Sequence, residues 1–325
     1  MIKVISIPPL ATVQDLGRDG HWYQGLGRAG AMDSLAHRAA NMLLGNEDTA
    51  ATLEIQLTPA RFEFTERQAF ALAGAPCGAT LDGHALPRVW AGMAQAGQML
   101  DLAGMPTGAR VYLALPGGID VPQVLGSRST QLRETFGGYQ GRVLRPGDHL
   151  DPIRKDPPTL PEAGLSLGLP PLRRDGEAAI ALRALSSGEH DEFTPDAQEA
   201  FWSTPFSVSP QSNRQGYRLE GANLTRKSHG ELRSHGIVPG IVQVPGGGAP
   251  IIQLADSATM GGYPKIAAVI AADLWRLGQA RPGDALRFQR VDLADAAAAE
   301  REMTALLHDW QGALTGIAQQ NRSWI

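Results

Sequence analysis

The tetrapeptide Arg145-Pro146-Gly147-Asp148 occurs a second time in this chain, as Arg281-Pro282-Gly283-Asp284. Two further landmarks precede each copy in the same order, a glycine and then an apolar stretch. These landmarks are Gly74 and residues 111–115 in the first half, and Gly221 and residues 251–255 in the second half. The shared order predicts two copies of one β unit, and a groove between two similar units is a common place for a small-molecule site.

The segments around these landmarks have the pattern of short strands. Between residues 53 and 72 the apolar side chains alternate with polar ones, as in strands that bury one face. The 38 glycines and 23 prolines among 325 residues supply the turns that many short strands need. Helices are expected after the N-cap residue Asp33, after Thr194, and over the alanine-rich residues 292–319. We therefore expect a mainly β protein with a few helices and a C-terminal helix.

Prolines mark the expected domain boundary. Five prolines fall within residues 155–176, which favours an extended linker over a helix or strand. The predicted organisation is an N-terminal β domain over residues 1–154, a proline-rich linker over 155–176, a second β domain over 177–290, and a C-terminal helix over 291–325.

Charge and composition narrow the functional classes. A net charge of −4 leaves no broad basic surface for nucleic-acid phosphates, so no nucleic-acid partner is expected. No apolar run has the length of a membrane span and no leader-like segment begins the chain, which predicts a soluble cytoplasmic protein without a membrane partner. Cys77 is the single cysteine, which excludes an intrachain disulfide and a zinc site with several cysteines.

Common catalytic motifs are absent from the sequence. There is no Gly-x-x-x-x-Gly-Lys-Ser/Thr loop for ATP phosphates and no Gly-x-Ser-x-Gly turn for a serine nucleophile. His229 and His235, with Glu231 between them, match no familiar zinc spacing. We therefore expect no metal site.

Polar residues in glycine-rich loops are the remaining candidates. Glycine lets the backbone approach a ligand closely, although the same glycines also serve simply as turn residues. Arg128, Arg218 and Lys265 are suited to neutralise a carboxylate or a developing oxyanion, or else they are solvated surface charges. Asp15 and Arg18 are either a local ion pair that braces a turn or ligand contacts. His235 is either an acid–base group or a packed histidine.

Several longer strings of the sequence carry a more specific signal. They include Thr12-Val13-Gln14-Asp15-Leu16-Gly17-Arg18, Gly30-Ala31-Met32-Asp33, Gly117-Gly118-Ile119-Asp120, Gly126-Ser127-Arg128-Ser129-Thr130, Ser212-Asn213-Arg214-Gln215-Gly216-Tyr217-Arg218 and Gly261-Gly262-Tyr263-Pro264-Lys265. The sequence from residue 2 to about residue 290 carries these strings in the order of one family, and it resembles the family of 5-oxoprolinase C subunits. That family is also described as allophanate hydrolase subunit 2-like or biotin-dependent carboxyltransferase-like, and it is similar to the carboxyltransferase region of urea amidolyase.

The resemblance implies two tandem cyclophilin-like β-barrel domains and a role in the ATP-dependent opening of 5-oxoproline to L-glutamate. It also implies two other 5-oxoprolinase subunits as partners, one A-like and one B-like. ATP would be used by the complex without necessarily binding to this chain. A lactam is a stabilised amide, so phosphorylation of its oxygen would make the ring carbon open to attack by water.

Combined with side-chain chemistry, the resemblance suggests roles for individual residues. The expected catalytic residues are Asp256, Tyr263, Lys265 and His235. The expected substrate-binding residues are Arg128, Arg218, Asp15, Arg18, Asp120, Gly261 and Gly262. The repeat further predicts that the loops over residues 117–130 and 256–265 face one shared site. Ala258 and Met260 depart from the Gln-Thr-Thr that many relatives have before Gly-Gly-Tyr-Pro, which leaves the substrate open.

Two other functions remain open on the sequence. The chain is alternatively a carboxyltransferase subunit that takes a carboxyl group from carboxybiotin on a partner. It has no Met-Lys-Met attachment motif, so no biotin would be attached to this chain. The third candidate is a regulatory binding module of a kinase-inhibitor system, which requires an exposed partner surface rather than a competent pocket.

Overall fold

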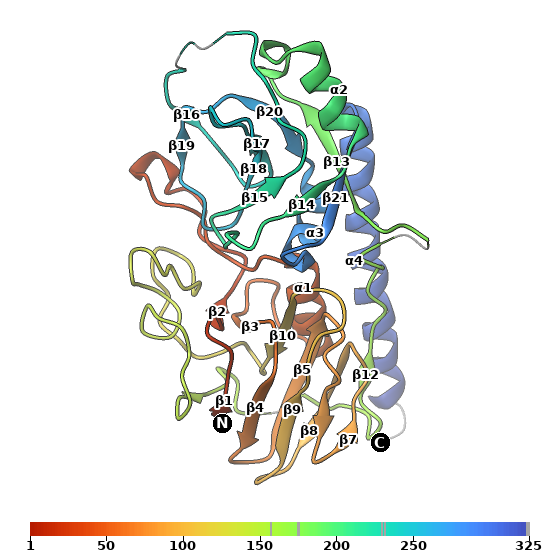
Figure 1. The fold of residues 1–325 in the computed structure, drawn as a ribbon. Helices are drawn as coiled ribbons and strands as arrows, with labels where there is room; N and C mark the ends of the chain where they lie inside the picture. The colour runs from red at the N-terminus through yellow and green to blue at the C-terminus, as the bar shows by residue number, and fades with distance from the viewer. Residues whose placement is uncertain (157, 174–175, 229, 231, 323–325) are drawn as a thin grey trace. The chain divides into compact units, whose positions relative to one another are not determined.

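The fold was obtained as a computed structural model, which describes residues 1–322 except 157, 174–175, 229 and 231, and side chains as far as Gln319 (Figure 1). The chain forms two compact units, each built from separate stretches. The first unit contains Met1–Arg18, Ala29–Pro170 and the residues from Ala305 onward. The second unit contains Asp19–Arg28 and Pro171–Thr304. Each unit is described separately below.

The first unit is built from two six-stranded sheets in which all neighbouring strands are antiparallel. Aromatic and branched side chains such as Phe62, Phe70 and Leu113 form its core. One sheet has the order β11 (His149–Leu150), β1 (Ile2–Ser6), β4 (Ala60–Phe64), β9 (Met99–Leu102), β6 (Thr80–Leu81) and β7 (His84–Ala85). The other has the order β12 (Leu165–Ser166), β8 (Trp90–Ala94), β5 (Gln68–Gly74), β10 (Arg110–Ala114), β3 (Thr52–Gln56) and β2 (Thr12–Gln14).

Helix α1 (Ser34–Leu43) lies against β5 and β10 of the first unit. The Asp33 side chain accepts a hydrogen bond from the Ala36 main-chain N–H, which satisfies one of the free donors at the helix start. Gly45 has a φ of 62°, the left-handed conformation that commonly ends a helix. The predicted start of this helix at Asp33 is therefore confirmed.

The second unit is a closed barrel of seven strands. Strands β13 and β21 close the barrel as its one parallel pair among the described strands. Around the barrel the order is β13 (Ile180–Ser186), β20 (Lys265–Val269), β17 (Ile241–Gln243), β18 (Ile251–Gln253), β15 (Gly216–Glu220), β14 (Phe206–Val208) and β21 (Ala285–Arg290). A separate two-stranded sheet joins β16 (His235–Gly236) to β19 (Met260–Gly261).

Helices are few, as the sequence predicts. The described chain also contains α2 (Pro195–Ser203), α3 (Leu274–Gln279) and the long C-terminal helix α4 (Leu293–Arg322), with the short 3₁₀ turns η1 (Trp22–Gln24), η2 (His190–Glu192) and η3 (Ala271–Asp273). The prediction of a mainly β protein with a few helices and a C-terminal helix is confirmed. Of the two expected barrels, the second unit forms a closed one of seven strands, whereas the described strands of the first unit form two six-stranded sheets. None of the described helices combines the length and apolar character needed to cross a membrane.

The two Arg-Pro-Gly-Asp copies adopt the same turn, first between Arg145 and Asp148. Gly147, with a φ of 92°, donates its N–H to the Val4 carbonyl, and Val4 donates its own N–H to the Asp148 carbonyl. The Asp148 carboxylate accepts the Arg145 N–H at 2.8 Å, which closes the turn. The turn thereby joins β11 to the neighbouring strand β1.

The second copy repeats these contacts atom for atom. Gly283 has a φ of 87° and donates to the Val208 carbonyl, while Val208 donates to the Asp284 carbonyl. The Asp284 carboxylate accepts the Arg281 N–H at 2.8 Å. The repeat in the sequence therefore corresponds to one turn used twice, although the strands around it form two six-stranded sheets in the first unit and a closed barrel in the second.

The stretch over residues 155–176 differs from the expected linker. Residues 165–166 form β12, which pairs with Ala91 and Trp90 of β8, and the Trp90 indole N–H donates to the Ala163 carbonyl at 3.1 Å. These contacts place the chain up to Pro170 in the first unit. The grouping of residues 19–28 with the second unit, and of the end of α4 with the first, was also not predicted.

Candidate functional site

Three ionisable side chains meet beside the barrel of the second unit: Glu189, His235 and Lys265. Lys265 is the first residue of β20 and is only 4% exposed, and its Nζ contacts His235 Nε2. Glu189 reaches both partners: its Oε1 lies 3.0 Å from His235 Nε2, and its Oε2 accepts the Lys265 main-chain N–H at 3.0 Å. We call these three residues the Lys265 cluster.

Local pairing explains why these residues come together. His235 lies opposite Gly261 in the β16–β19 ladder, so the histidine stands beside the glycine-rich strand that leads to Lys265. Glu189 precedes the turn η2, which follows β13, and β13 is a direct neighbour of β20 in the barrel. The cluster therefore joins three chain segments that are far apart in the sequence.

The surroundings of Lys265 favour proton transfer. Burial lowers the pKa of Lys265 below its usual value, and the negative charge of Glu189 partly opposes this effect. His235 Nδ1 lies 3.0 Å from the Arg233 carbonyl, and its Nε2 contacts both Lys265 Nζ and Glu189 Oε1. The His235 side chain is 43% exposed, so a proton shared within the cluster can be exchanged with solvent at His235.

Lys265 and His235, two of the predicted catalytic residues, thus lie in contact. The contacts of the other two, Tyr263 and Asp256, are with different residues. Tyr263 is 53% exposed, and its main-chain carbonyl accepts a hydrogen bond from Gln243. Asp256 forms a bidentate ion pair with Arg214, with Nε to Oδ2 at 2.9 Å and Nη2 to Oδ1 at 3.0 Å. Both Asp256 oxygens are therefore engaged, which favours a structural role for this residue.

Arg218 lies on β15 with an exposed side chain. It lines a cavity of about 330 Å³ together with Glu220 and the residues around Gly247. The described lining of that cavity includes no member of the Lys265 cluster. Arg218 and Lys265 are therefore not shown to share a site.

In the first unit, Asp15 holds the loop over residues 126–130. Its Oδ1 accepts from the Ser127 hydroxyl at 2.7 Å, the Ser129 hydroxyl at 2.5 Å and the Gly17 N–H at 2.8 Å, while its Oδ2 accepts the Arg128 N–H at 2.5 Å. Asp15 is 5% exposed. Its carboxylate is thus a buried brace that fixes the backbone at Arg128, whereas an ion pair with Arg18 and a ligand contact both stay predictions.

The two arginines of this region have different environments. Arg18 is 1% exposed, donates from Nη2 to the Ser129 carbonyl at 2.7 Å and stacks on the Phe136 ring. Arg128 is half-buried and donates from Nε to the Val121 carbonyl at 3.1 Å. Asp120 is exposed. Their contacts to a substrate stay a prediction, as does a site shared by the two loops, which belong to different units.

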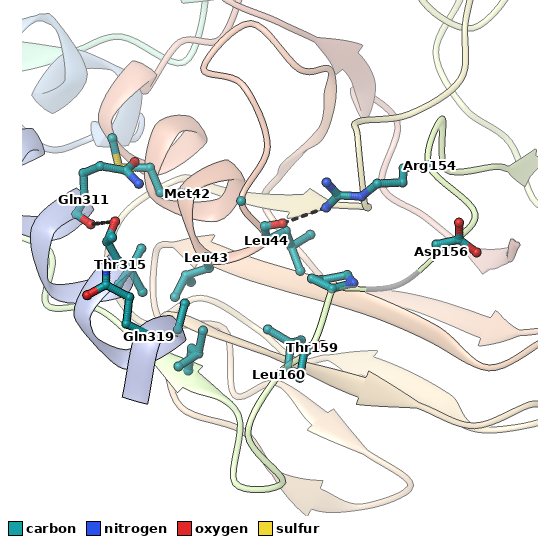
Figure 2. Close-up of a pocket in the computed structure, with 15 residues that line it drawn as sticks. Met42, Leu43, Leu44, Arg154, Asp156, Thr159, Leu160, Gln311, Thr315 and Gln319 are labelled. Carbon is teal, nitrogen blue, oxygen red and sulfur yellow. Dashed lines mark hydrogen bonds between the residues drawn. The ribbon is translucent and has the colours of Figure 1, made fainter. Parts of the chain in front are cut away.

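A cavity of about 670 Å³ in the first unit has no link to these residues (Figure 2). Leu43 and Leu44 at the end of α1, the segment around Leu160 and the face of α4 at Leu314 line it, and Arg154 at its edge donates to the Leu44 carbonyl at 2.9 Å. None of the predicted site residues is among its described lining residues. Its position gives no support for a catalytic role.

Sequence reasoning missed Glu189, the third member of the Lys265 cluster. Glu189 follows a glycine directly after a strand, the same type of loop that marked the other candidates, but no spacing rule connects it to residues 235 and 265. The sequence predicts no zinc site at His229, Glu231 and His235. The structure describes His235, whereas His229 and Glu231 lie outside the described residues.

Comparisons with known proteins agree with this fold. Residues 24–290 match the family model "Carboxyltransferase domain, subdomain A and B". The chain is 43% identical to the C subunit of 5-oxoprolinase from Escherichia coli and 39% identical to the same subunit from Haemophilus influenzae, and each match covers 93% of this chain and 95% of the relative.

A solved structure with the same fold is that of K. lactis urea amidolyase. It superposes with a TM-score of 0.85 at 27% identity, covering 95% of this chain, whereas the chain spans only 20% of the length of that larger protein. The two 5-oxoprolinase relatives, in contrast, match over nearly their whole lengths. The chain therefore belongs to the family of 5-oxoprolinase C subunits, which has the carboxyltransferase-domain fold with subdomains A and B.

Proposed function

We propose that this chain is one component of an ATP-dependent 5-oxoprolinase, a cyclic-amide hydrolase that opens 5-oxoproline to L-glutamate together with two partner subunits, one A-like and one B-like. The relatives that match over their whole lengths support this assignment. Within the chain, the observation that carries it is the contact of the half-exposed His235 with the buried Lys265.

Ring opening needs two proton movements. The attacking water must lose a proton, and the ring nitrogen must gain one as it becomes the amine of glutamate. Lys265 and His235 can serve as linked proton carriers. The pKa of Lys265 is lowered toward neutral pH, so its ammonium group gives up a proton more readily than an exposed lysine does. Glu189 stabilises positive charge on this pair. Positive charge near the carbonyl also stabilises the oxyanion that develops during attack.

Other predicted roles are part of the same proposal. Arg128, Arg18 or Arg218 would hold the substrate carboxylate, for which a guanidinium is suited by its paired donors. ATP is a co-substrate of the complex, and the partner subunits supply at least part of its site, because this sequence has no standard phosphate loop. A cytoplasmic complex without nucleic-acid or membrane partners fits this chemistry.

The experiment is reconstitution with the two candidate partners. Glutamate and ADP are measured from 5-oxoproline and ATP for the wild type, for Lys265→Met and for Lys227→Met. Lys227 is an exposed lysine of the same unit whose Nζ donates to the Asp191 carbonyl, so it controls for the loss of a lysine charge. We expect Lys265→Met to lower kcat about 10²-fold or more, in the range of a lost proton carrier, and Lys227→Met to leave it unchanged.

The results separate the possible functions. An inactive wild-type complex with correctly folded, assembled partners contradicts the proposed hydrolase. An active complex that tolerates Lys265→Met removes the Lys265 cluster from the mechanism while the function stands.

A carboxyltransferase is the second candidate function, supported by the family model and by the match to K. lactis urea amidolyase. It predicts transfer of labelled carboxylate from a biotinylated carrier protein to a small acceptor in the presence of this chain. Binding to a partner without turnover in either assay would instead favour the regulatory module.

A further inference from the structure

Two glutamine side chains connect the barrel wall of the second unit to the strand that leads to Lys265. Gln253 donates from Nε2 to Gln243 Oε1 at 3.0 Å, and Gln243 donates from Nε2 to the Tyr263 carbonyl at 3.2 Å. Gln243 is 3% exposed. Because its oxygen accepts one hydrogen bond and its nitrogen donates the other, the two partners fix the orientation of the Gln243 amide.

Gly261 leaves room for this amide. A Cβ at position 261 would lie 2.6 Å from Gln243 Nε2, closer than non-bonded heavy atoms approach. Gly261 is also the residue opposite His235 in the β16–β19 ladder. The absence of a side chain at position 261 therefore lets Gln243 reach the Tyr263 carbonyl next to the Lys265 cluster.

The main-chain pairing of β17 with β20 is irregular at Lys265. Strands β17 and β20 shift register between Val242 and Gln243, directly where Gln243 becomes the partner of Lys265. At such an irregularity the main-chain ladder is locally disrupted. The Gln243 side chain adds a hydrogen bond at this place, and Glu189 adds another to the Lys265 N–H.

We propose that Gln243, oriented by Gln253, is a positioning residue that sets the place of Lys265 relative to His235 during ring opening. This role rests on the proposed hydrolase function. Gln243 acts through the backbone of residues 261–265 and needs no contact with substrate. Its loss should therefore lower kcat and leave KM nearly unchanged.

The first test is Gln243→Met in the reconstituted complex, since methionine has a similar length and cannot make the two hydrogen bonds. We expect kcat to fall about 10²-fold, the effect typical of a misplacement of about 1 Å, with KM within about twofold. Gln215→Met, at an exposed glutamine of the same unit that does not line the Arg218 cavity, is the control and should match the wild type. Wild-type kcat in a folded Gln243→Met complex overturns the proposal.

The second test is Gln243→Glu over a range of pH. A protonated carboxyl can donate to the Tyr263 carbonyl and accept from Gln253, whereas a carboxylate can only accept. The ratio of variant to wild-type kcat should therefore rise as the pH falls toward about 5, since burial raises the pKa of a carboxyl above its usual value of about 4.3. A ratio that stays low and flat across this range contradicts the positioning role, even if Gln243→Met fails to fold.

A third measurement does not need turnover. In the isolated chain, the NMR chemical shifts of the His235 ring should change in Gln243→Met and stay as in the wild type in Gln215→Met. Unchanged His235 chemical shifts in Gln243→Met overturn the positioning role even if the reconstituted complex makes no glutamate. A wild-type complex that makes no glutamate would count against the hydrolase function and not against the positioning role.

Discussion

The ion pair between Asp256 and Arg214 gives a prediction that separates a structural role from a catalytic one. The side chains are 11% and 6% exposed, and two hydrogen bonds of 2.9 and 3.0 Å join them. In Asp256→Asn, the amide nitrogen would face a guanidinium N–H, so at least one of these bonds is replaced by two opposed donors. The Arg214 charge would then be nearly buried without its counter-ion.

The expected cost follows from these contacts. A hydrogen bond to a charged group contributes about 1.5–3 kcal/mol, and removing one partner of a buried ion pair costs about 3–5 kcal/mol. We therefore expect Asp256→Asn to lower the free energy of unfolding by about 3 kcal/mol. For a unit of this size that corresponds to a fall in Tm of about 10 °C.

The assay is urea unfolding followed by tryptophan fluorescence, with Asp191→Asn as the control. Asp191 is in the same unit, and its side chain is 94% exposed, so its substitution should change the stability by less than about 0.5 kcal/mol. The activity of folded Asp256→Asn in the reconstituted complex is measured in parallel. Unchanged stability together with lost activity would refute the structural role and return Asp256 to the catalytic group.

Two further predictions concern buried groups of the first unit. Burial raises the pKa of the Cys77 thiol to about 11, so iodoacetamide at neutral pH should modify Cys77 in unfolded protein and leave it largely unmodified in the native state, as mass spectrometry would show; rapid native labelling would contradict this. Tyr112 donates to Glu54 at 2.6 Å and accepts the Asp33 N–H at 2.8 Å, so Tyr112→Phe should cost about 2 kcal/mol of stability. Burial, reinforced by Glu54, raises the pKa of Tyr112 in the folded state, so this stabilisation is complete below the unfolded pKa of about 10 and is lost as the pH rises through the folded value. Stability curves of wild type and Tyr112→Phe that run parallel above pH 10 would contradict this linkage.

Much of the fold followed from local signals. The helix starts at Asp33 and Thr194 and the alanine-rich residues 292–319 are signals that depend on neighbouring residues, and the corresponding helices are present. The segment over 155–176 misled because proline content is a local signal, whereas β12 forms through pairing with β8 and through the Trp90 hydrogen bond. Such a partner, distant in the sequence, cannot be read from the segment itself.

The candidate site also combines residues that the sequence identifies with residues that only the fold brings together. Lys265 and His235 were identified from their chemistry, and the β16–β19 pairing joins them. Glu189 was missed because its contribution depends on the neighbouring strands β13 and β20. Nothing in the sequence indicates the ion pair of Asp256, because its partner Arg214 is adjacent only after β15 and β18 pair, and the catalytic role of Asp256 stays a prediction. Residue type thus identifies candidate groups, while their pairing decides between structure and chemistry.

The polar groups around Asp15 in the first unit and around Lys265 in the second unit are satisfied in different ways. In the first unit, the carboxylate of Asp15 is consumed by hydroxyl and N–H donors of the loop itself. Gly137 and Gly138 close that region further, since a Cβ at either position would collide with Ser129 or Thr130. In the second unit, the loop ends at a buried lysine whose histidine partner is 43% exposed. A loop whose polar groups are satisfied by its own hydrogen bonds is rigid. A loop that places an exposed imidazole beside a buried amine can exchange a proton with a ligand. The Arg-Pro-Gly-Asp turn is therefore kept in both units, whereas the pairing of the exposed His235 imidazole with the buried Lys265 amine belongs to the second unit.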